Sequence, residues 1–220
     1  MKKEKKLLKI INVASDWIIK IIMINLLIIS TSLLIVTFVH SLQAGYKLLK
    51  DYVNKDEVKL IRTYFKYFKE NFLNKIFLSL IALSTIVLIV ISNIYYQNTI
   101  KEAPTLIAYL GFITTLIVGF VIIISTLYVP VVLTSIENIT VEETVKISFF
   151  LSIKYIFRSI AMVIIFLIPG LLMMSSLTML LLVFCGISLP LLSVVILAEK
   201  PANYLLLSKE HKDEIRDWIS

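Results

Sequence analysis

Residues 61–96 read IRTYFKYFKENFLNKIFLSLIALSTIVLIVISNIYY, and this stretch joins two contrasting patterns. Its first part, 61–75, gathers aromatic side chains among lysines and an arginine. The second part, 76–96, is an apolar run with no ionisable group except its terminal tyrosines. A run of this length suits a membrane-spanning helix, and tyrosine rings suit the boundary between lipid and water. The stretch therefore predicts a membrane span that follows directly on a surface segment.

That surface segment has the spacing of an amphipathic helix, which we predict over residues 58–75. Its apolar residues recur at steps of four, three and four and form one face: Ile61, Phe65, Phe68 and Phe72. Its cations fall mostly around the other side: Arg62, Lys66, Lys69 and Lys75. Aromatic rings at headgroup depth, with cations facing anionic lipid, are typical of a helix lying in the membrane surface. The alternative is a linker helix that packs on neighbouring loops.

The composition of the whole chain agrees with a membrane protein. Of 220 residues, 59% are hydrophobic and 17% charged, and the mean hydropathy is +0.93. No soluble fold buries that much apolar surface, so the lipid bilayer must solvate most side chains. The net charge of +7 is explained by cytoplasmic loops and anionic lipid headgroups, and we expect no nucleic-acid partner. The single cysteine, Cys185, lies in an apolar run and is interpreted as a small hydrophobic residue.

Charge-poor runs predict an all-α integral membrane protein with about five spans in one domain, residues 1–220. The predicted spans are 17–39, 76–96, 104–127, 158–175 and 179–198, between an interfacial segment, 1–16, and a C-terminal tail, 199–220. Residues 159–198 lack formal charge over a helical length of about 60 Å, twice the hydrocarbon thickness, and must fold back. The predicted turn is at Ser175–Ser176 with Thr178, and Pro169–Gly170 offers a second place to break.

An internal repeat organises these spans. The segments VKLIRTYFKYFKENFLNKIF from Val58 and VKISFFLSIKYIFRSIAMVI from Val145 begin alike, 87 residues apart. The same offset carries the first span onto the third and the start of the second into the fourth. We predict two parallel units, each a span, a basic surface helix and a second span, followed by a fifth span.

The distribution of cations predicts the orientation. Residues 40–75, 131–158 and 199–220 hold 15 of the 22 Lys and Arg residues, and the N-terminus with Lys101 holds the remaining 7. Because cytoplasmic segments are rich in cations, both surface helices and the C-terminus are predicted to be cytoplasmic. The basic N-terminus conflicts with this rule. Either it is translocated, or the first segment does not fully cross.

Three elements stand out in residues 25–53 and 63–77: Asn25-Leu26-Leu27, the span ending Ile35-Val36-Thr37, and Lys69, Asn71 and Phe72 before the second span. With these elements the chain resembles the YesL-type family of bacterial multi-pass membrane proteins. Leu34 replaces the proline of the family pattern, and Val39-His40 replaces its Gly-Pro. The resemblance implies a protein of the bacterial cell membrane with no established biochemical activity. It also implies a genetic link to carbohydrate-uptake ABC transporters and glycoside-degrading enzymes.

The sequence offers little for catalysis. It holds no P-loop, dinucleotide fingerprint, HExxH motif or Cys/His cluster, and His40 and His211 are too isolated for a metal site. We therefore expect no enzyme, no cofactor and no metal. Glu142 and Glu143 are expected to favour the start of the second surface helix. The notable intramembrane polar residues are Asn25 and Asn93, which either bond between helices or line a path for a small solute.

Two functions remain after these exclusions. The first is an accessory or scaffold protein that binds a membrane partner, such as the permease of a carbohydrate-uptake ABC transporter. The alternative is a small-solute transporter or channel in its own right. Coupled carriers usually place carboxylates or histidines within their spans, and these spans hold none. The sequence therefore favours the accessory protein, in contact with the lipid bilayer and its anionic headgroups.

Overall fold

The computed structural model describes residues 2–172 and 176–210, and every regular element in this part of the chain is helical. In chain order these elements are α1 (Lys2–Ser32), the 3-10 helix η1 (Ile35–Thr37), α2 (Phe38–Val53), α3 (Leu60–Lys69), α4 (Phe72–Glu102), α5 (Leu106–Ser135), α6 (Val141–Lys154), α7 (Ile156–Leu172), α8 (Ser176–Cys185), α9 (Ser188–Leu197) and α10 (Glu199–Glu210). By length and composition three helices can cross a membrane: α1 from Ile10 onward, α4 and α5. The bent pairs α6–α7 and α8–α9 raise this number to five if each pair is one span. The predicted all-helical membrane fold is thus confirmed.

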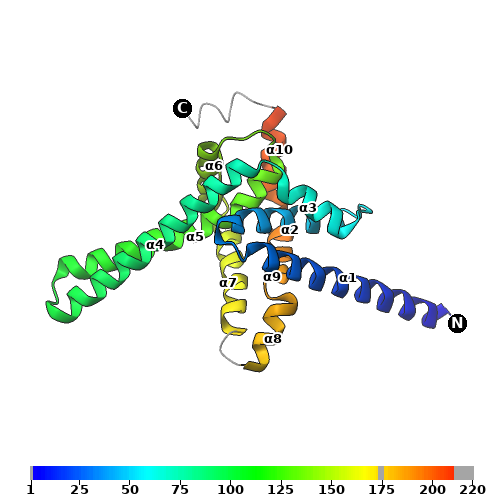
Figure 1. Cartoon of the computed structure of the whole chain (residues 1–220), viewed down its shortest axis with the longest axis horizontal. Helices are drawn as coiled ribbons and strands as arrows, with labels where there is room; N and C mark the ends of the chain where they lie inside the picture. Colours follow the sequence, from blue (N-terminus) through cyan, green and yellow to red (C-terminus); the bar gives the residue numbers. More distant parts are fainter. Residues whose placement is uncertain (1, 173–175, 211–220) are drawn as a thin grey trace.

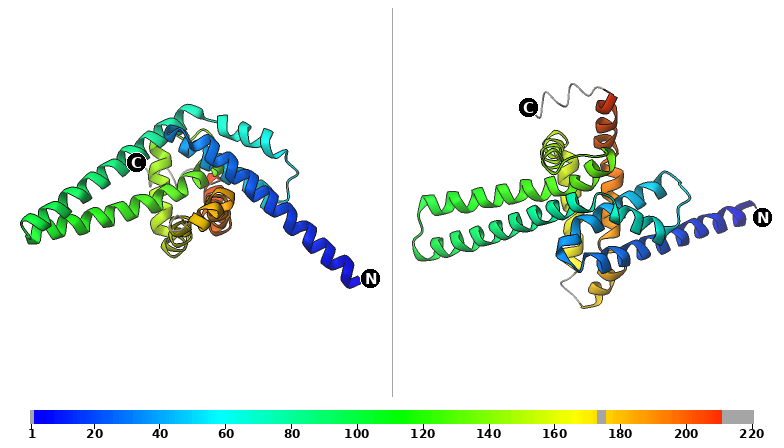
Figure 2. Two further views of the ribbon diagram at one scale, coloured as in Figure 1. Left: turned by 60° about the horizontal axis from the view of Figure 1, so that its bottom comes forward. Right: turned by 45° about the horizontal axis from the view of Figure 1, so that its top comes forward.

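The helices form a central hub from which three arms extend (Figure 1). One arm is α1, the second is the antiparallel pair α4–α5, and the third contains α7 and α8. Figure 2 shows α4 and α5 side by side out to the turn at residues 103–105. Helices α2, α3, α6, α9 and α10 make up the hub, together with the inner ends of the arms. The hub therefore holds the buried core, and the arms present long apolar surfaces.

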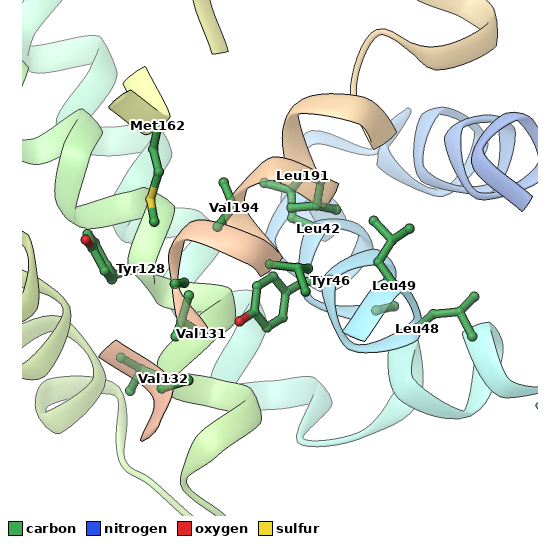
Figure 3. Packing of buried hydrophobic residues seen from close by; sticks show 14 of the residues in the cluster. Leu42, Tyr46, Leu48, Leu49, Tyr128, Val131, Val132, Met162, Leu191 and Val194 are labelled. Atoms are coloured by element: carbon green, nitrogen blue, oxygen red, sulfur yellow. The ribbon is translucent and has the colours of Figure 1, made fainter. Parts of the chain in front are cut away.

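The interior helix of the hub is α2, which the sequence analysis left as part of a cytoplasmic segment. Eleven of its sixteen residues are buried. Tyr46 points toward α5 and α9 in Figure 3, and Leu49 belongs to the same buried cluster. A Cβ atom at Gly45 would lie 2.6 Å from Ile28 Cδ1 and 3.1 Å from Leu191 Cδ2. A glycine at this point therefore lets α2 approach both α1 and α9 closely.

The first arm ends earlier than predicted, because α1 stops at Ser32 and the predicted span runs to residue 39. The three hydroxyl residues 30–32 all bond back to carbonyl oxygens of their own helix, on Leu27 and Ile29. Such bonds compete with the helical ladder and favour bends or ends of helices. Thr37 then donates to the carbonyl of Leu34 and stabilises the tight turn of η1. The chain re-enters the hub as α2 instead of continuing straight.

The last hairpin contains a break that the sequence analysis did not predict. The predicted span 179–198 is divided between α8 and α9, which meet at 55°. A Cβ atom at Gly186 would lie 2.6 Å from Leu182 Cα, so the turn requires glycine. The predicted turn at residues 175–176 falls partly outside the described residues, and Thr178 lies inside α8. At the alternative break, α7 continues through Pro169 to Leu172.

Both predicted surface helices are present as short helices that bend into longer ones. Helix α3 is shorter than the predicted range 58–75 and ends at Lys69. Asn71 adopts a left-handed conformation with φ of 47°, which asparagine tolerates better than most residues. Phe72 and Lys75 consequently belong to α4. In the second unit α6 meets α7 at 101°. The parallel orientation of the two units stays a prediction.

The start of α6 is fixed by a reciprocal cap. Thr140 Oγ1 accepts a hydrogen bond from the Glu143 backbone N–H at 3.2 Å, and Glu143 Oε2 accepts one from the Thr140 backbone N–H at 3.0 Å. This capping box satisfies two N–H groups that the helix itself leaves unpaired. Glu143 therefore supports the N-terminus of α6, as the sequence analysis expects.

Candidate functional site

The predicted surface helix presents its cations outward. Arg62, Lys66 and Lys69 are exposed on α3, together with Ile61 (53% exposed) and Phe65 (40% exposed). Phe68 is partly buried and stacks against other rings of the hub. Phe72, 41% exposed, lies on α4 beyond the break. The outer face of α3 thus mixes aromatic, aliphatic and cationic side chains, a combination suited to a lipid surface.

The residue that attaches α3 to the hub is Tyr64, which belongs neither to the predicted apolar face nor to the predicted cations of this helix. Its side chain is fully buried. The hydroxyl lies 2.7 Å from Thr31 Oγ1 on α1 and 3.5 Å from the carbonyl oxygen of Ser41 on α2. Burial raises the pKa of Tyr64 to about 12, so the phenol stays neutral. One side chain therefore joins three helices.

The junction between α3 and α4 is held by buried polar side chains from both sides. Lys75 is 1% exposed, and its ammonium group donates to the carbonyl of Tyr67 at 2.8 Å. His40 of α2 contacts the carbonyl of Phe72 through Nε2 at 2.9 Å. A partly buried ion pair of 2.7 Å between Lys47 and Glu70 closes the same turn. Lys75 is thus a structural residue here and not a cation of the surface helix.

The environment of His40 determines its protonation. Burial lowers the pKa of His40, the positive charge of Lys75 lowers it further, and only the bond to Phe72 opposes them. The neutral ring must carry its proton on Nε2, because a carbonyl oxygen can only accept. Nδ1 is then a buried acceptor without a partner among the described residues. The rings of Phe68 and Phe72 lie 5.4 and 4.6 Å from the imidazole, centre to centre.

A second polar contact joins α2 and α3 near the C-terminal end of each helix. Tyr67 donates its hydroxyl proton to Asp51 Oδ2 at 2.7 Å, and Lys47 lies over the Tyr67 ring at 4.2 Å. Burial raises the pKa of the Asp51 carboxyl, although the Tyr67 hydroxyl and two lysines oppose this shift. Burial and the adjacent carboxylate raise the pKa of Tyr67. The hydrogen bond between Tyr67 and Asp51 therefore ties α3 to α2.

Asn25 occupies the break between α8 and α9. Its Nδ2 donates to the carbonyls of Leu182 at 3.0 Å and Val183 at 2.6 Å. Its Oδ1 accepts from the backbone N–H groups of Ile187 at 2.8 Å and Ser188 at 2.9 Å. The side chain is fully buried. One amide thus satisfies four backbone groups at a broken helix, where unpaired groups are costly in an apolar environment.

Asn93 has a different role from Asn25. It lies on the α4 arm, where its Oδ1 accepts a hydrogen bond from Gln97 Nε2 of the same helix at 2.8 Å. The two asparagines are on different arms and share no partner. The structure therefore does not bring the two predicted intramembrane polar residues together.

A polar hollow of about 600 Å³ lies between α1 and the loop that follows α2. Trp17, Lys20 and Tyr52 line one side of it, and loop residues 55–59 line the other. Lys20 bonds to Asp16 at 2.7 Å and lies 4.4 Å from the centre of the Tyr52 ring. Lys20 thus contacts the hub instead of extending freely along α1.

The described residues contain no group of three or more His, Cys, Asp or Glu side chains that could hold a metal ion. Comparison with known proteins gives one match. Residues 21–93 match a protein family described as "Protein of unknown function, DUF624". No curated protein and no solved structure matches the chain.

The DUF624 match covers the N-terminal part of the hub. It runs from the second half of α1 through α2 and α3 and ends in α4. Asn25, His40, Tyr64 and Lys75 all lie within it. The chain is therefore a multi-pass membrane protein, similar over this region to a family of unknown function.

Proposed function

We propose that this protein is a non-enzymatic accessory or scaffold component of the bacterial cell membrane, associated with a carbohydrate-uptake ABC transporter. The YesL-type resemblance of residues 25–77 supports this proposal, since its elements fall inside the region that matches DUF624. The expected partner is the permease subunit, which also lies in the bilayer.

The observation that carries the proposal is the exposed apolar surface of the arms. In the most apolar stretch of α4, which is 18 residues long, only 11% is buried within the chain. Leu88 on α4 is 63% exposed and Phe157 on α7 is 86% exposed. Such surfaces must meet lipid or the helices of a partner. A hub that holds three separate arms is suited to gathering other membrane helices around it.

The alternative, a transporter or channel, receives less support from this arrangement. Asn25 is fully engaged by four backbone groups, and Asn93 bonds within its own helix. Neither amide is therefore placed to line a polar path. Ion-coupled carriers also rely on carboxylates or histidines within their spans, and the predicted spans of this chain hold none.

The cation distribution supports a cytoplasmic location for both surface helices and the C-terminus. The fold is compatible with this orientation. Helices α6 and α10 lie at one end of the molecule, and the turn at 103–105 next to Lys101 lies at the far tip of the α4–α5 arm (Figure 1).

Site-specific photocrosslinking in native membranes tests the proposed partnership. A photoreactive amino acid at Leu88 or Phe157 should crosslink the permease, which mass spectrometry would identify. The same amino acid at Ala44, which is fully buried in α2, should give no intermolecular product and serves as the control. Reconstituted vesicles containing this protein alone should show no solute flux. Solute flux from the protein alone, or crosslinks to lipid only at both exposed positions, would refute the accessory function.

A further inference from the structure

An apolar hollow lies between α4, α5 and α6, away from the polar contacts of the hub. Its volume is about 330 Å³, at the lower end of the range for small-molecule sites. Val39, Leu78 and Val129 form its most buried part, with exposed fractions of 3%, 4% and 8%. Ile81 and Phe149 also line the hollow and are 44% and 47% exposed. The hollow therefore reaches from the core to the outer surface of the arm.

The walls along α4 and α5 suit a hydrocarbon chain. The lining residues of both helices follow each other at helical spacing over about two turns and are apolar or small: Leu78, Ile81, Ala82, Thr85, Ile122, Ser125, Thr126 and Val129. The hydroxyls of Thr85, Ser125 and Thr126 each donate to a carbonyl of their own helix, four residues earlier. These donors are satisfied, so the groove they line accepts an apolar occupant without losing hydrogen bonds.

Helix α6 contributes Ser148 and Lys146 to the hollow. Ser148 is 1% exposed and lines the hollow, but its hydroxyl has no hydrogen-bond partner among the described residues. A hydroxyl without a partner still has a hydrogen bond to donate. Lys146, two residues away, is the only charged residue among those that line the hollow. It pairs with Glu142 at 3.0 Å, and its side chain is 47% exposed.

We propose that this hollow binds one anionic phospholipid. An acyl chain lies in the groove between α4 and α5, an ester carbonyl accepts the hydrogen bond of Ser148, and the phosphate lies near Lys146. The hollow offers apolar walls, a buried hydroxyl and a cation to the acyl chain, the ester and the phosphate of such a lipid. Because α4 and α5 are both candidate membrane helices, a lipid reaches the hollow from the bilayer itself.

Photocrosslinking with a lipid probe tests this site in the full-length protein. The protein is reconstituted in phosphatidylcholine nanodiscs that contain phosphatidylglycerol with a diazirine on one acyl chain. Crosslinked peptides, identified by mass spectrometry, should cluster at the lining segments 78–85, 122–129 and 145–149. Unlabelled phosphatidylglycerol should compete with the probe more strongly than phosphatidylcholine does. Crosslinks spread evenly over the exposed faces of α4 and α5 would overturn the proposal.

Two variants separate the groove from ordinary lipid contact. Ala82→Phe fills the groove and should abolish the clustered crosslinks. Leu88→Phe enlarges a side chain on the exposed face of the same helix, outside the hollow, and should leave them unchanged. Both proteins should elute as the wild type does in gel filtration. A folded Ala82→Phe protein that still gives the full cluster would refute the site.

Ser148→Ala and Lys146→Gln test the polar end. Ser148→Ala removes a hydroxyl that has no protein partner, so the lipid-free protein should keep its thermal stability in detergent. Crosslinking in nanodiscs should nevertheless fall about fivefold, the factor expected for one hydrogen bond. Lys146→Gln should lower the preference for phosphatidylglycerol over phosphatidylcholine by about fivefold, the factor expected for one cation near an anionic surface. Unchanged crosslinking in Ser148→Ala, or unchanged preference in Lys146→Gln, would overturn the assigned lipid pose. Lys101→Gln, at the far tip of the arm, is the matched control and should leave the preference unchanged.

Discussion

Replacing Asn25 by leucine tests whether the amide stabilises the broken helix α8–α9. Leucine keeps a similar volume but offers neither a donor nor an acceptor to the four backbone groups. A hydrogen bond contributes about 1 kcal/mol net in water and about 0.6 kcal/mol in membrane proteins. Four such bonds give an expected loss of about 2–4 kcal/mol in the free energy of unfolding. A loss of this size is a large fraction of the stability of most proteins.

Unfolding in mixed micelles, with increasing denaturing detergent, measures this loss. Asn93→Leu is the matched control, since it removes from a candidate span an amide whose hydrogen-bond partner, Gln97, lies on the same helix. It should change the unfolding free energy by less than about 0.5 kcal/mol, as substitutions outside the core do. Asn25→Asp should be destabilising at neutral pH, because a carboxylate cannot donate to the carbonyls of Leu182 and Val183. Equal losses in Asn25→Leu and Asn93→Leu would refute the special role of Asn25.

Three further predictions concern the hub and the orientation of the chain. Burial lowers the pKa of His40 below its ordinary value of 6.5, so the unfolded chain binds the proton more tightly and acidification should destabilise the fold. His40→Gln should therefore reduce the fall in Tm between about pH 7.5 and about pH 5.5, and an unchanged fall would contradict this account. Tyr64→Phe removes the hydroxyl that joins α3 to α1 and should cost about 1 kcal/mol of unfolding free energy. Tyr95→Phe, at a residue 63% exposed on α4, should cost almost nothing, and equal effects would argue against the Tyr64 contacts. In a cysteine-free background, a cysteine at Lys101 should react with a membrane-impermeant thiol reagent in intact cells, whereas one at Glu143 should be protected; the reverse pattern would overturn the predicted orientation.

The sequence was most informative where a single physical requirement dominates. The run 76–96 must be helical because an unpaired backbone is costly in lipid, and α4 indeed covers it. The helix extends further at both ends, since the flanking residues continue the same backbone hydrogen bonds into a polar environment. Composition marks the part of a helix that lies in lipid, and it does not mark where the helix itself begins or ends.

Helix α2 was not predicted, although a signal for it exists. Leu42, Tyr46 and Leu49 recur at steps of four and three residues, which is helical spacing. Lys47 and Lys50 beside them indicate a cytoplasmic segment, although the two lysines leave the apolar periodicity intact. Lys75 misled in the same way, because its charge suggested a surface residue while its ammonium group is satisfied by a buried carbonyl.

The contacts of Asn25 could not be predicted from the sequence. Its partners lie 157 to 163 residues away along the chain. A polar residue within a span indicates that some partner exists, and the sequence alone does not identify it. The break at Gly186 carried a weak signal of the same kind, since one glycine within an apolar run is common in membrane helices.

Residues within the DUF624 match contact helices that lie far beyond it in the chain. The matched residues 21–93 include Asn25 and Gly45, which contact α8 and α9 at residues 182–191. The amide of Asn25 lies deep in the hub only because the backbone of the broken helix satisfies it. Without those partners, a fully buried amide would carry the cost of an unpaired polar group. The last helices therefore stabilise the part of the chain that resembles the family, and the hub folds as one unit from both ends of the sequence.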